Sequence, residues 1–363
     1  MHYVCTVPVE LIRRPEELSA DWLTSVLRAS GATSDGAAIS RFEPVAIGTG
    51  QMSESYRVRL DWGHGGSGPG SVVIKIAAAD ETSRSTGVGL GIYEREIRFY
   101  QEVAPRVDGA VASCHLAAYD STQGWFTLVL EDAAPAVQGD QIAGGTLEQA
   151  RLAMRELARL QAPVWNDSSL ATADWLNQPQ VVNEAIVTPL LGEFIKRYHE
   201  RLAPEHRGVA ERFVTKLDGW LGDRRPPFSI AHGDYRLDNM LFGRPGSGEP
   251  LTVVDWQTVS WGPPLLDASY FLGAGLTVED RRAYEQQLVR EYYDNLVALG
   301  ATGLSWEACW DEYRRRAFHG VLMSIIAPIL VVRTERGDEM FMTSMARHAQ
   351  QVLDLGAEEL LPG

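Results

Sequence analysis

The sequence has few cysteines, and their positions exclude two classes of protein. Cys5, Cys114 and Cys309 lie far apart and form no Cys-x-x-Cys pair. Thiolate zinc sites and disulfide frameworks depend on clustered or regularly spaced cysteines, so we expect neither. Dispersed cysteines are typical of a reducing compartment, and we therefore expect a cytoplasmic protein.

Positive charge is also scarce. The chain has 33 Lys and Arg residues against 48 Asp and Glu residues, which gives a formal net charge of −15. A general nucleic-acid binder needs a basic face to neutralise phosphates, so no nucleic-acid partner is expected. An acidic surface usually serves solubility, although it is also compatible with cationic ligands.

Long apolar runs are missing as well. The longest, "VLMSIIAPILVV" at 321–332, is interrupted by Pro328 and is shorter than the roughly 20 residues of a membrane-spanning helix. The N-terminal "MHYVCTVPVELIRRPEEL" does not have the apolar core of a secretory signal. We therefore expect a soluble protein without membrane insertion, as a monomer or a homodimer.

The residues that are present have the composition of a globular protein. Hydrophobic residues make up 45% and charged residues 22% of the 363, a length that is long for one domain and usual for two. The first part has the pattern of a small antiparallel sheet that carries one helix. Its order is two strands around a glycine turn in 42–62, a strand at 71–77, a helix at 91–105, and strands near 113–119 and 124–132, preceded by a helix at 15–30.

After a Gly- and Ala-rich connection at 133–145, the pattern is mostly helical. The exception is a short hairpin, in which "NMLF" and "LTVVDW" flank a Gly/Pro loop. Further helices are expected from 147 onward and near 279–298, 306–333 and 338–355. The sequence thus predicts an α+β fold of two lobes, with residues 1–135 forming the smaller lobe and 136–363 the larger helical one.

Two stretches concentrate polar residues. "HGDYRLDNMLF" at 232–242 contains Asp234 and Asn239, and "VVDWQTVSWGPPLLD" at 253–267 places Asp255 within an apolar strand. A charge in that position costs free energy unless a cation compensates it. The two carboxylates and the amide oxygen are hard ligands that suit Mg²⁺, which binds a few oxygens together with substrate phosphates.

Earlier elements supply further charged groups. Lys75 lies in the middle of an apolar strand and needs a carboxylate partner, for which Glu96 on the next helix is the obvious candidate and Glu94 the competing one. Gly48 and Gly50 lie in a turn between two strands, where backbone amides can approach phosphates closely. Together these are the parts of a phosphoryl-transfer site.

Two other nucleotide-binding classes are excluded. The chain has no G-x-x-x-x-G-K-[ST] motif, so it is not a P-loop enzyme. The glycine turn lies between two strands, whereas a NAD-dependent oxidoreductase needs a strand, turn and helix in that order.

The polar stretches resemble a known family. "HGDYRLDN" is similar to the H-x-D-x-x-x-x-N catalytic loop of the protein-kinase-like fold, and the glycine after the histidine resembles aminoglycoside phosphotransferases and choline kinases. "VVDWQ" looks like their metal-binding strand. "YEREIRFY", "FTLVLED" and "GTGQMSESYRV" resemble the ecdysteroid-kinase-like branch of this group. No D-F-G or A-P-E segment is evident, which argues against a protein substrate.

The resemblance implies roles at matching positions. Asp234 would be the catalytic base, Asn239 and Asp255 would hold Mg²⁺, and Lys75 would contact the α- and β-phosphates, steadied by Glu96. The smaller lobe would then bind the nucleotide, and the larger lobe would carry the catalytic loop and the acceptor site.

Other matching positions imply weaker roles. The backbone from Glu131 to Ala133 would be the hinge that meets adenine. Arg236 stands where protein kinases often place a lysine near the transferred phosphate. Ser53 replaces the third glycine of the turn and either touches a phosphate or is an ordinary turn serine.

Three neighbouring polar residues have structural interpretations. His232 is expected to hold its loop by hydrogen bonds, and Asp267 to cap a helix or brace a loop. Asp238 is expected to be a solvated turn residue.

The sequence as a whole predicts an ATP- and Mg²⁺-dependent phosphotransferase that acts on a hydroxyl group of a small molecule. Acidic residues on the helical lobe favour an amine such as an aminoglycoside or choline. Most of the residues Trp165, Trp175, Trp261, Trp306 and Trp310 are expected in the core, but they would equally suit a pocket for an apolar alcohol such as a steroid-like compound. The ecdysteroid-kinase-like resemblance implies such a neutral, fairly apolar acceptor. The alternative is a nucleotide-binding module of the same fold that transfers nothing.

Overall fold

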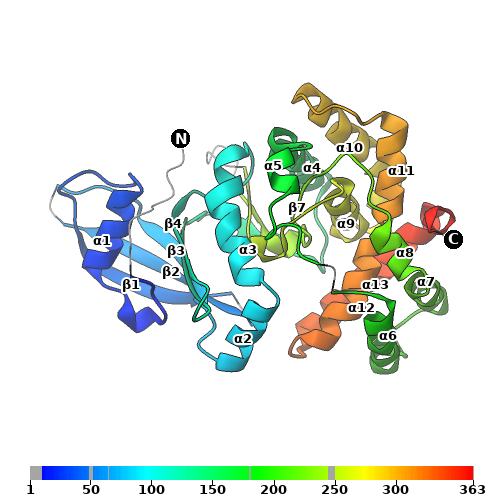
Figure 1. Ribbon diagram of the computed structural model, residues 1–363, viewed down its shortest axis with the longest axis horizontal. Helices are drawn as coiled ribbons and strands as arrows, with labels where there is room; N and C mark the ends of the chain where they lie inside the picture. The colour runs from blue at the N-terminus through cyan, green and yellow to red at the C-terminus, as the bar shows by residue number, and fades with distance from the viewer. Residues whose placement is uncertain (1–9, 49–51, 64, 180, 244–249, 363) are drawn as a thin grey trace. The chain divides into compact units, whose positions relative to one another are not determined.

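A computed structural model describes residues 10–48, 52–63, 65–179, 181–243 and 250–362 (Figure 1). The chain divides into two compact units. The first comprises the described residues up to Arg106, then Val111–Pro135 and Val254–Val259. The second comprises Val107–Ala110, Ala136–Val253 and the described residues from Ser260 onward. The assignment of the nucleotide to residues 1–135 and of the acceptor to 136–363 stays a prediction.

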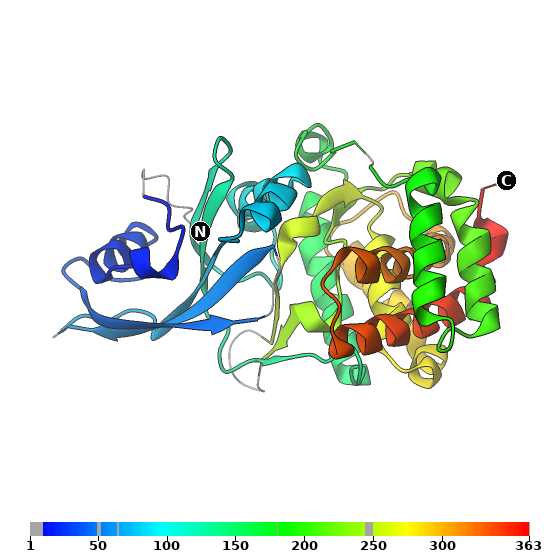
Figure 2. The same cartoon turned by 90° about the horizontal axis from the view of Figure 1, so that it is seen from below.

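The first unit is built on an antiparallel sheet of five strands, as predicted (Figure 2). The order across the sheet is β1-β2-β3-β5-β4, so the last hairpin pairs with β3 through β5. The strands are β1 (Ile39–Ile47), β2 (Ser53–Trp62), β3 (Ser71–Ala77), β4 (Cys114–Asp120) and β5 (Trp125–Glu131). Alternating burial along β3 shows that one face of this sheet belongs to the core.

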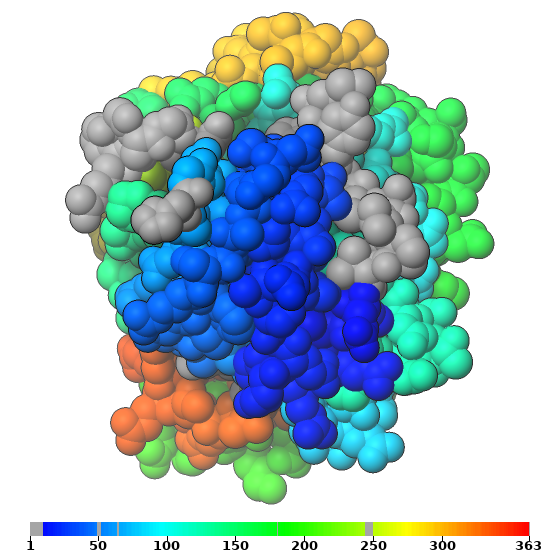
Figure 3. Space-filling view, turned by 90° about the vertical axis from the view of Figure 1, so that its left-hand side faces the viewer, coloured from blue at the N-terminus to red at the C-terminus, as the bar shows by residue number. Residues whose placement is uncertain are grey.

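Helix α1 (Ala20–Ala29) packs against this sheet, and Figure 3 shows the dark blue α1 segment beside the lighter blue strands. It is shorter than the predicted helix at 15–30, because Ser19 caps its first turn by accepting a hydrogen bond from the amide of Trp22. The preceding residues form the short η1 (Pro15–Glu17). The core beneath α1 consists mainly of aliphatic residues, including Leu23, Val26, Leu27, Val58, Val72, Ile74 and Val129.

The predicted helix at 91–105 is present but changes its type along its length. It begins as α3 (Ile92–Arg98), continues as the π-helical turn η2 (Phe99–Val103) and ends as the 3-10 turn η3 (Ala104–Arg106). A further helix, α2 (Glu81–Gly89), was not predicted, because "ETSRSTGVG" has no apolar stripe. Asp80 caps α2 by accepting from the amide of Ser83 at 2.7 Å.

The second unit is mainly helical, as predicted. Its long helices are α4 (Leu147–Gln161), α6 (Glu184–Tyr198), α7 (Pro204–Val214), α9 (Leu265–Gly275), α10 (Val278–Ala298), α11 (Trp306–Arg316), α12 (Phe318–Leu330) and α13 (Glu335–Asp354). Shorter turns are η4 (Ala162–Val164), α5 (Ser168–Ala171), α8 (Leu217–Gly222), η5 (Leu237–Asn239) and η7 (Ala357–Leu360). The single helix expected at 306–333 is two helices that meet at Ala317.

The core of the second unit lies between α6, α7, α12 and α13. Phe213 and Phe318 stack there with ring centroids 4.8 Å apart, and Phe194 is fully buried beside them. Burying aromatic side chains of this size supplies much of the stabilising free energy of such a core.

Short strands connect the helices of the second unit. Strands β6 (Val137–Gln138), β8 (Met240–Phe242) and β9 (Leu251–Val253) form one small sheet, and β7 (Ser229–Ala231) pairs with β10 (Ser260–Gly262). The predicted hairpin is therefore present as β8 and β9. It is shorter than expected, because β9 ends at Val253 and Asp255 lies beyond it.

Candidate active site

Lys75, Glu96 and Asp255 meet within the first unit. The Lys75 Nζ atom lies 2.7 Å from a Glu96 carboxylate oxygen and 2.7 Å from Asp255 Oδ1. Strand β3 presents Lys75, helix α3 presents Glu96, and Asp255 precedes η6 (Trp256–Thr258). The predicted pairing of Lys75 with Glu96 is present in the structure, whereas Glu94 pairs with Arg98. Asp255 is an additional partner of the lysine.

The three groups differ in exposure. The side chains of Lys75 and Glu96 are 12% and 3% exposed, and that of Asp255 is 31% exposed. Burial opposes the charged form of Lys75, but the charges of Asp255 and Glu96 outweigh it and raise the pKa of the lysine. Burial raises the pKa of Glu96, against the opposing effect of Lys75. The two carboxylates thus hold Lys75 in its charged form.

The position of Asp255 is fixed by its neighbours. Its backbone is left-handed, with φ at 69°, which a non-glycine residue adopts only where surrounding contacts hold it. Trp256 stacks on Phe99 with centroids 3.9 Å apart, and the Trp256 amide donates to Glu96. The prediction that Asp255 lies within an apolar strand is therefore wrong. Within the first unit, its charge is compensated by Lys75.

The glycine turn between β1 and β2 is described in part. Gly48 has φ at +74°, a conformation that favours glycine, and Gly50 lies outside the described residues. Ser53 is the first residue of β2 and is buried. The Tyr93 hydroxyl on α3 donates to the carbonyl of Met52, which braces the second half of the turn.

The predicted hinge lies at the end of β5. Glu131 is exposed and its amide donates to Ser113 O at 2.8 Å, while Ala133 follows the strand and is half-buried. Between them, Asp132 accepts two hydrogen bonds from Arg57 and one from Ser71. Burial opposes ionisation of Asp132, but these bonds prevail and lower its pKa. Sequence reasoning missed Asp132 as the residue that holds this segment.

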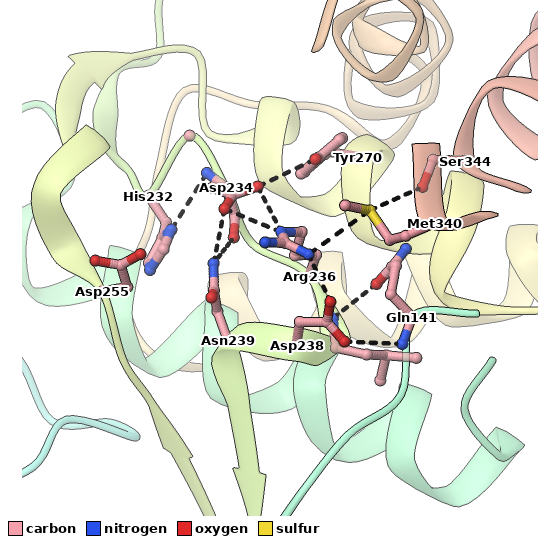
Figure 4. Close-up of polar contacts among 12 residues, drawn as sticks. Gln141, His232, Asp234, Arg236, Asp238, Asn239, Asp255, Tyr270, Met340 and Ser344 are labelled. Carbon is pink, nitrogen blue, oxygen red and sulfur yellow. Dashed lines mark hydrogen bonds and ion pairs between the residues drawn. The ribbon is translucent and has the colours of Figure 1, made fainter. Parts of the chain in front are cut away.

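The second unit contains the loop with Asp234, shown in Figure 4. Arg236 Nε lies 3.0 Å from each carboxylate oxygen of Asp234. Asn239 Nδ2 donates to Asp234 Oδ2 at 2.8 Å and to the Asp234 carbonyl at 2.9 Å. The Tyr270 hydroxyl donates to Asp234 Oδ1 at 3.1 Å. Both carboxylate oxygens of Asp234 thus accept hydrogen bonds, yet the Asp234 side chain is 20% exposed.

Arg236 bridges two carboxylates of the loop. Besides Asp234, it contacts Asp238 through Nη1 at 2.8 Å. Burial opposes its charged form, but Asp234 and Asp238 prevail and raise the pKa of the guanidinium. Because its Nε–H is shared between two oxygens of Asp234, each of those bonds is weaker than a single aligned one.

The prediction that Asp238 is a solvated turn residue is wrong. Its side chain is 10% exposed and is bound by Arg236 and Arg336. The amide of Gln141 also donates to Asp238 Oδ1, and Gln141 Oε1 in turn accepts from the amide of Leu237 at 3.0 Å. Burial raises the pKa of Asp238, but Arg236 and Arg336 outweigh it and lower the value. No local pattern marked Gln141, which lies almost 100 residues before its partners.

Asp267 braces the start of the loop, which was one of the two roles predicted for it. It is fully buried in α9 and accepts from the amides of His232 at 2.6 Å and Gly233 at 2.9 Å. Burial raises the pKa of Asp267 to about 7, against the effect of these two bonds. His319 Nε2 lies 2.8 Å from the Gly233 carbonyl. His232 is buried, and its Nδ1 lies 3.2 Å from the Asp234 amide, consistent with a role in holding the loop.

Asn239 and Asp255 carry oxygens that suit Mg²⁺. Asn239 directs its NH₂ group to Asp234, so its Oδ1 remains as a ligand atom. Asp255 offers a partly exposed carboxylate, with Lys75 and Gln257 as partners. Among the described residues, no group of three or more His, Cys, Asp or Glu side chains forms a metal cage. Each of the two residues thus offers an oxygen of the kind that Mg²⁺ takes, since this ion is usually held by only one or two protein side chains.

Comparison with known proteins places the chain in a family. A model of the ecdysteroid kinase-like family matches residues 48–302, which is more than half of the chain. The chain belongs to the ecdysteroid kinase-like family. The matched span includes the Lys75 group and the Asp234 loop, and the resemblance seen in the sequence is confirmed.

Curated relatives match over short segments. Acyl-CoA dehydrogenase family member 10 of Mus musculus is 29% identical over 85 residues, which are 22% of this chain and 8% of that protein. An uncharacterized kinase-like protein of Caenorhabditis elegans is 32% identical over 89 residues, 24% of this chain and 23% of that one. The chain spans less than a quarter of the length of each of these relatives.

Solved structures of small-molecule kinases share the fold. APH(2″)-IIa in complex with gentamicin has a TM-score of 0.52 at 13% identity, covering 93% of this chain and 99% of that one. Choline kinase from Cryptosporidium parvum has a TM-score of 0.51 at 11% identity, covering 89% and 92%. The GDP and kanamycin complex of APH(2″)-IIIa has a TM-score of 0.50 at 16% identity, covering 94% and 97%. At these identities the likeness shows the fold alone.

These findings confirm the predicted protein-kinase-like fold of an antiparallel-sheet unit and a larger helical unit. The family is described as kinase-like, and the structural neighbours named above include a choline kinase. Within the described part of the chain, every helix is too short or too polar to cross a membrane.

Proposed function

We propose that the protein transfers the γ-phosphoryl group of ATP to a hydroxyl group of a small molecule, with Mg²⁺. The proposal goes beyond the family in naming the nucleotide, the metal and the acceptor group. It is supported by the chemistry of the two side-chain groups just described, one in each unit.

The single observation that carries the proposal is the way Asp234 is held. Its carboxylate accepts hydrogen bonds from Arg236, Asn239 and Tyr270, yet stays partly open to solvent. A general base must be fixed within reach of the proton that it accepts. An acceptor hydroxyl would donate to Asp234 by replacing one half of the bond shared with Arg236. Asp234 would then orient the hydroxyl oxygen for attack on the γ-phosphorus and accept its proton.

Lys75 is proposed to bind the nucleotide phosphates. Its charge is held by Glu96, which keeps the ammonium fixed on the sheet of the first unit. A pre-positioned cation stabilises the negative charge of the transferring phosphoryl group without reorganisation during the reaction. Gly48, Gly50 and Ser53 would line the phosphates, and the backbone from Glu131 to Ala133 would meet the base.

Asn239 and Asp255 are the residues proposed to hold Mg²⁺, through the amide oxygen and the carboxylate. When bound, the ion would neutralise charge on the phosphate oxygens. Arg236 is proposed to act near the transferred phosphate once the acceptor has displaced part of its bond to Asp234.

The acceptor is proposed to be a small alcohol. Trp175 and Trp261 are buried at 2% and 5% exposure, so they belong to the core and do not line a binding surface. Trp165, Trp306 and Trp310 are half-buried. Trp310 stacks on both Tyr313 and Trp306, so packing accounts for the positions of Trp306 and Trp310. Packing thus accounts for most of the five rings, as expected, and the choice between an apolar alcohol and an amine stays open.

The test is incubation of the protein with MgATP and a panel of small-molecule alcohols, including aminoglycosides, choline and neutral polycyclic alcohols. ADP release is recorded, and products are identified by a mass gain of one phosphoryl group. Acceptor-dependent ADP release with a phosphorylated product is expected. A protein that binds MgATP but phosphorylates no compound, and that releases no ADP even to water, would instead be a silent nucleotide-binding module.

A further inference from the structure

Tyr270 contacts the proposed base from a helix outside the loop that carries the base. It lies on α9, and its hydroxyl donates to Asp234 Oδ1 at 3.1 Å. The other two donors, Arg236 and Asn239, belong to the loop that carries Asp234. Tyr270 is therefore the donor that ties the carboxylate to the helical core of the second unit. Figure 4 shows its hydroxyl directed at Asp234.

The Tyr270 ring is itself held on two sides. The imidazole of His348 on α13 is parallel to it, with centroids 5.2 Å apart and an interplanar angle of 3°. The ring of His319 on α12 meets it nearly edge-on, at 5.0 Å and 73°. Stacked and edge-to-face arrangements of this kind restrict a ring to one orientation. Tyr270 is 9% exposed, so few alternative rotamers are open to it.

The histidine beneath Tyr270 occupies a niche made by glycines. A Cβ atom at Gly273 or Gly320 would overlap the His348 ring, so the neighbouring helices α9 and α12 approach the imidazole through backbone alone. His348 is fully buried, and among the described residues neither ring nitrogen has a partner with hydrogen-bond geometry, although the Gln351 side chain is close enough to act on its pKa. Its position is thus set by packing, and its contribution to Tyr270 is a flat supporting surface.

The same region of α9 holds the backbone of the loop. Asp267 lies three residues before Tyr270, and it binds the amides of His232 and Gly233, as described above. Residues three apart share one face of a helix. One face of α9 therefore fixes the backbone before Asp234 through Asp267, and the carboxylate through Tyr270.

We propose that Tyr270 is a positioning residue that fixes the carboxylate of Asp234 for proton acceptance. The inference rests on the proposed function of Asp234 as base and assigns the residue that orients it. Without the Tyr270 hydroxyl, Oδ1 keeps only its share of the divided Arg236 bond. The remaining described donors, Arg236 and Asn239, both lie on the loop of Asp234 itself, so the carboxylate can turn about its Oδ2 bond to Asn239.

The experiment compares Tyr270→Phe with the matched variant Tyr292→Phe. Both remove one buried hydroxyl from the second unit and keep the ring, but Tyr292 bonds Gln161 and does not contact Asp234. Two readouts are used: kcat and KM for MgATP in ADP release, with water as acceptor if no alcohol is active, and the position of Asp234 in crystal structures.

We expect Tyr270→Phe to lower kcat about tenfold to a hundredfold, with KM for MgATP within about twofold of the wild type. Its crystal structure should show the Asp234 carboxylate turned from its wild-type position. Tyr292→Phe should change neither kcat nor the position of the Asp234 carboxylate. The split between kcat and KM separates positioning of the base from loss of the fold.

Two results would overturn the inference. One is a Tyr270→Phe enzyme with kcat equal to that of Tyr292→Phe; the other is an unchanged Asp234 position in its crystal structure. If the wild type itself releases no ADP, the proposed function fails. The crystal structures then decide separately whether Tyr270 positions the carboxylate.

Discussion

Asp234 and Lys75 show how single residues acquire their chemistry from their partners. Asp234 accepts hydrogen bonds from donors in the second unit. Lys75 lies on a strand of the first unit and pairs with two carboxylates. The sequence singled out Asp234 by its spacing from Asn239, and Lys75 by its place in the middle of an apolar strand. It could not identify Tyr270, because a hydrogen bond to a residue 36 positions away leaves no local pattern.

The carboxylate of Asp234 is expected to be needed for turnover and not for nucleotide binding. Asp234→Asn keeps the size of the side chain but accepts a proton poorly, so kcat should fall by about 10² to 10⁴. Affinity for MgATP, measured by calorimetric titration, should stay within severalfold. Turnover retained at the wild-type rate would refute the assignment of Asp234 as base.

The buried pair of Lys75 and Glu96 is expected to contribute to stability only as a pair. Lys75→Met leaves Glu96 buried beside Asp255 without its cation, which should cost about 3–5 kcal/mol of unfolding free energy. The double variant Lys75→Met with Glu96→Gln should recover a large part of that loss.

Denaturant unfolding of the two variants and the wild type measures this coupling. If the single and the double variant lose the same unfolding free energy, the unpaired charge of Glu96 is not the reason that Lys75 stabilises the fold.

Elements show where sequence reasoning succeeds and where it fails. The strands β2, β3 and β5 have alternating or continuous apolar residues, and each was predicted. The helix α2 was missed, because its stability comes from the Asp80 cap and its packing on α3, and not from an apolar stripe. The end of β9 was also misplaced, because the left-handed backbone of Asp255 is set by stacking of Trp256 on Phe99.

The candidate site residues were easier to predict from the sequence than the residues that hold their segments in place by hydrogen bonds. The residues of the two motifs were recognised by spacing, and the structure brings Lys75, Glu96 and Asp255 together in one unit and Asp234, Arg236 and Asn239 in the other. Their supports, Gln141 and Asp132, act through contacts between distant segments. Such contacts depend on the packing of whole elements, so one sequence does not reveal them.

Two glycines within helices of the second unit are expected to respond oppositely to alanine. At Gly320 in α12, a Cβ atom would overlap the His348 ring, so Gly320→Ala should lower the unfolding free energy by about 1–3 kcal/mol. At Gly192 in α6 nothing lies within 4 Å, so Gly192→Ala should raise it by up to about 1 kcal/mol.

Thermal and urea unfolding of the two variants test the glycine niche. A stable Gly320→Ala protein would mean that α12 does not approach His348 as closely as the structure describes.

At the scale of the whole molecule, stability is expected to depend on pH through His348. Burial lowers the pKa of this imidazole to about 3, whereas an unfolded histidine has a pKa of about 6.5. The folded pKa is below the unfolded one, so the stabilisation is present above about pH 6.5 and is lost as the pH falls toward 3. Tyr270 stacks on the ring, and the polar and charged groups that act on its pKa are Gln351, His319, Arg281 and Arg347.

The measurement compares urea unfolding of the wild type and His348→Gln at several pH values. Glutamine does not titrate, so subtracting the two curves removes the effect of the other ionisable groups. Relative to the variant, the wild type should lose a few kcal/mol between pH 7 and pH 4. A difference that does not change with pH would show that His348 is accessible to protons in the folded state.

The central claim is that this chain binds MgATP in order to transfer its phosphoryl group. The most direct test is thermal unfolding of the wild type with MgATP, with ATP plus a chelator, and without ligand, beside the same series for Asp255→Asn. A ligand that binds only the folded state raises the midpoint by mass action. We predict a rise with MgATP that is reduced by the chelator and lost in Asp255→Asn. No rise with millimolar MgATP, or an equal rise in the variant, would contradict the account.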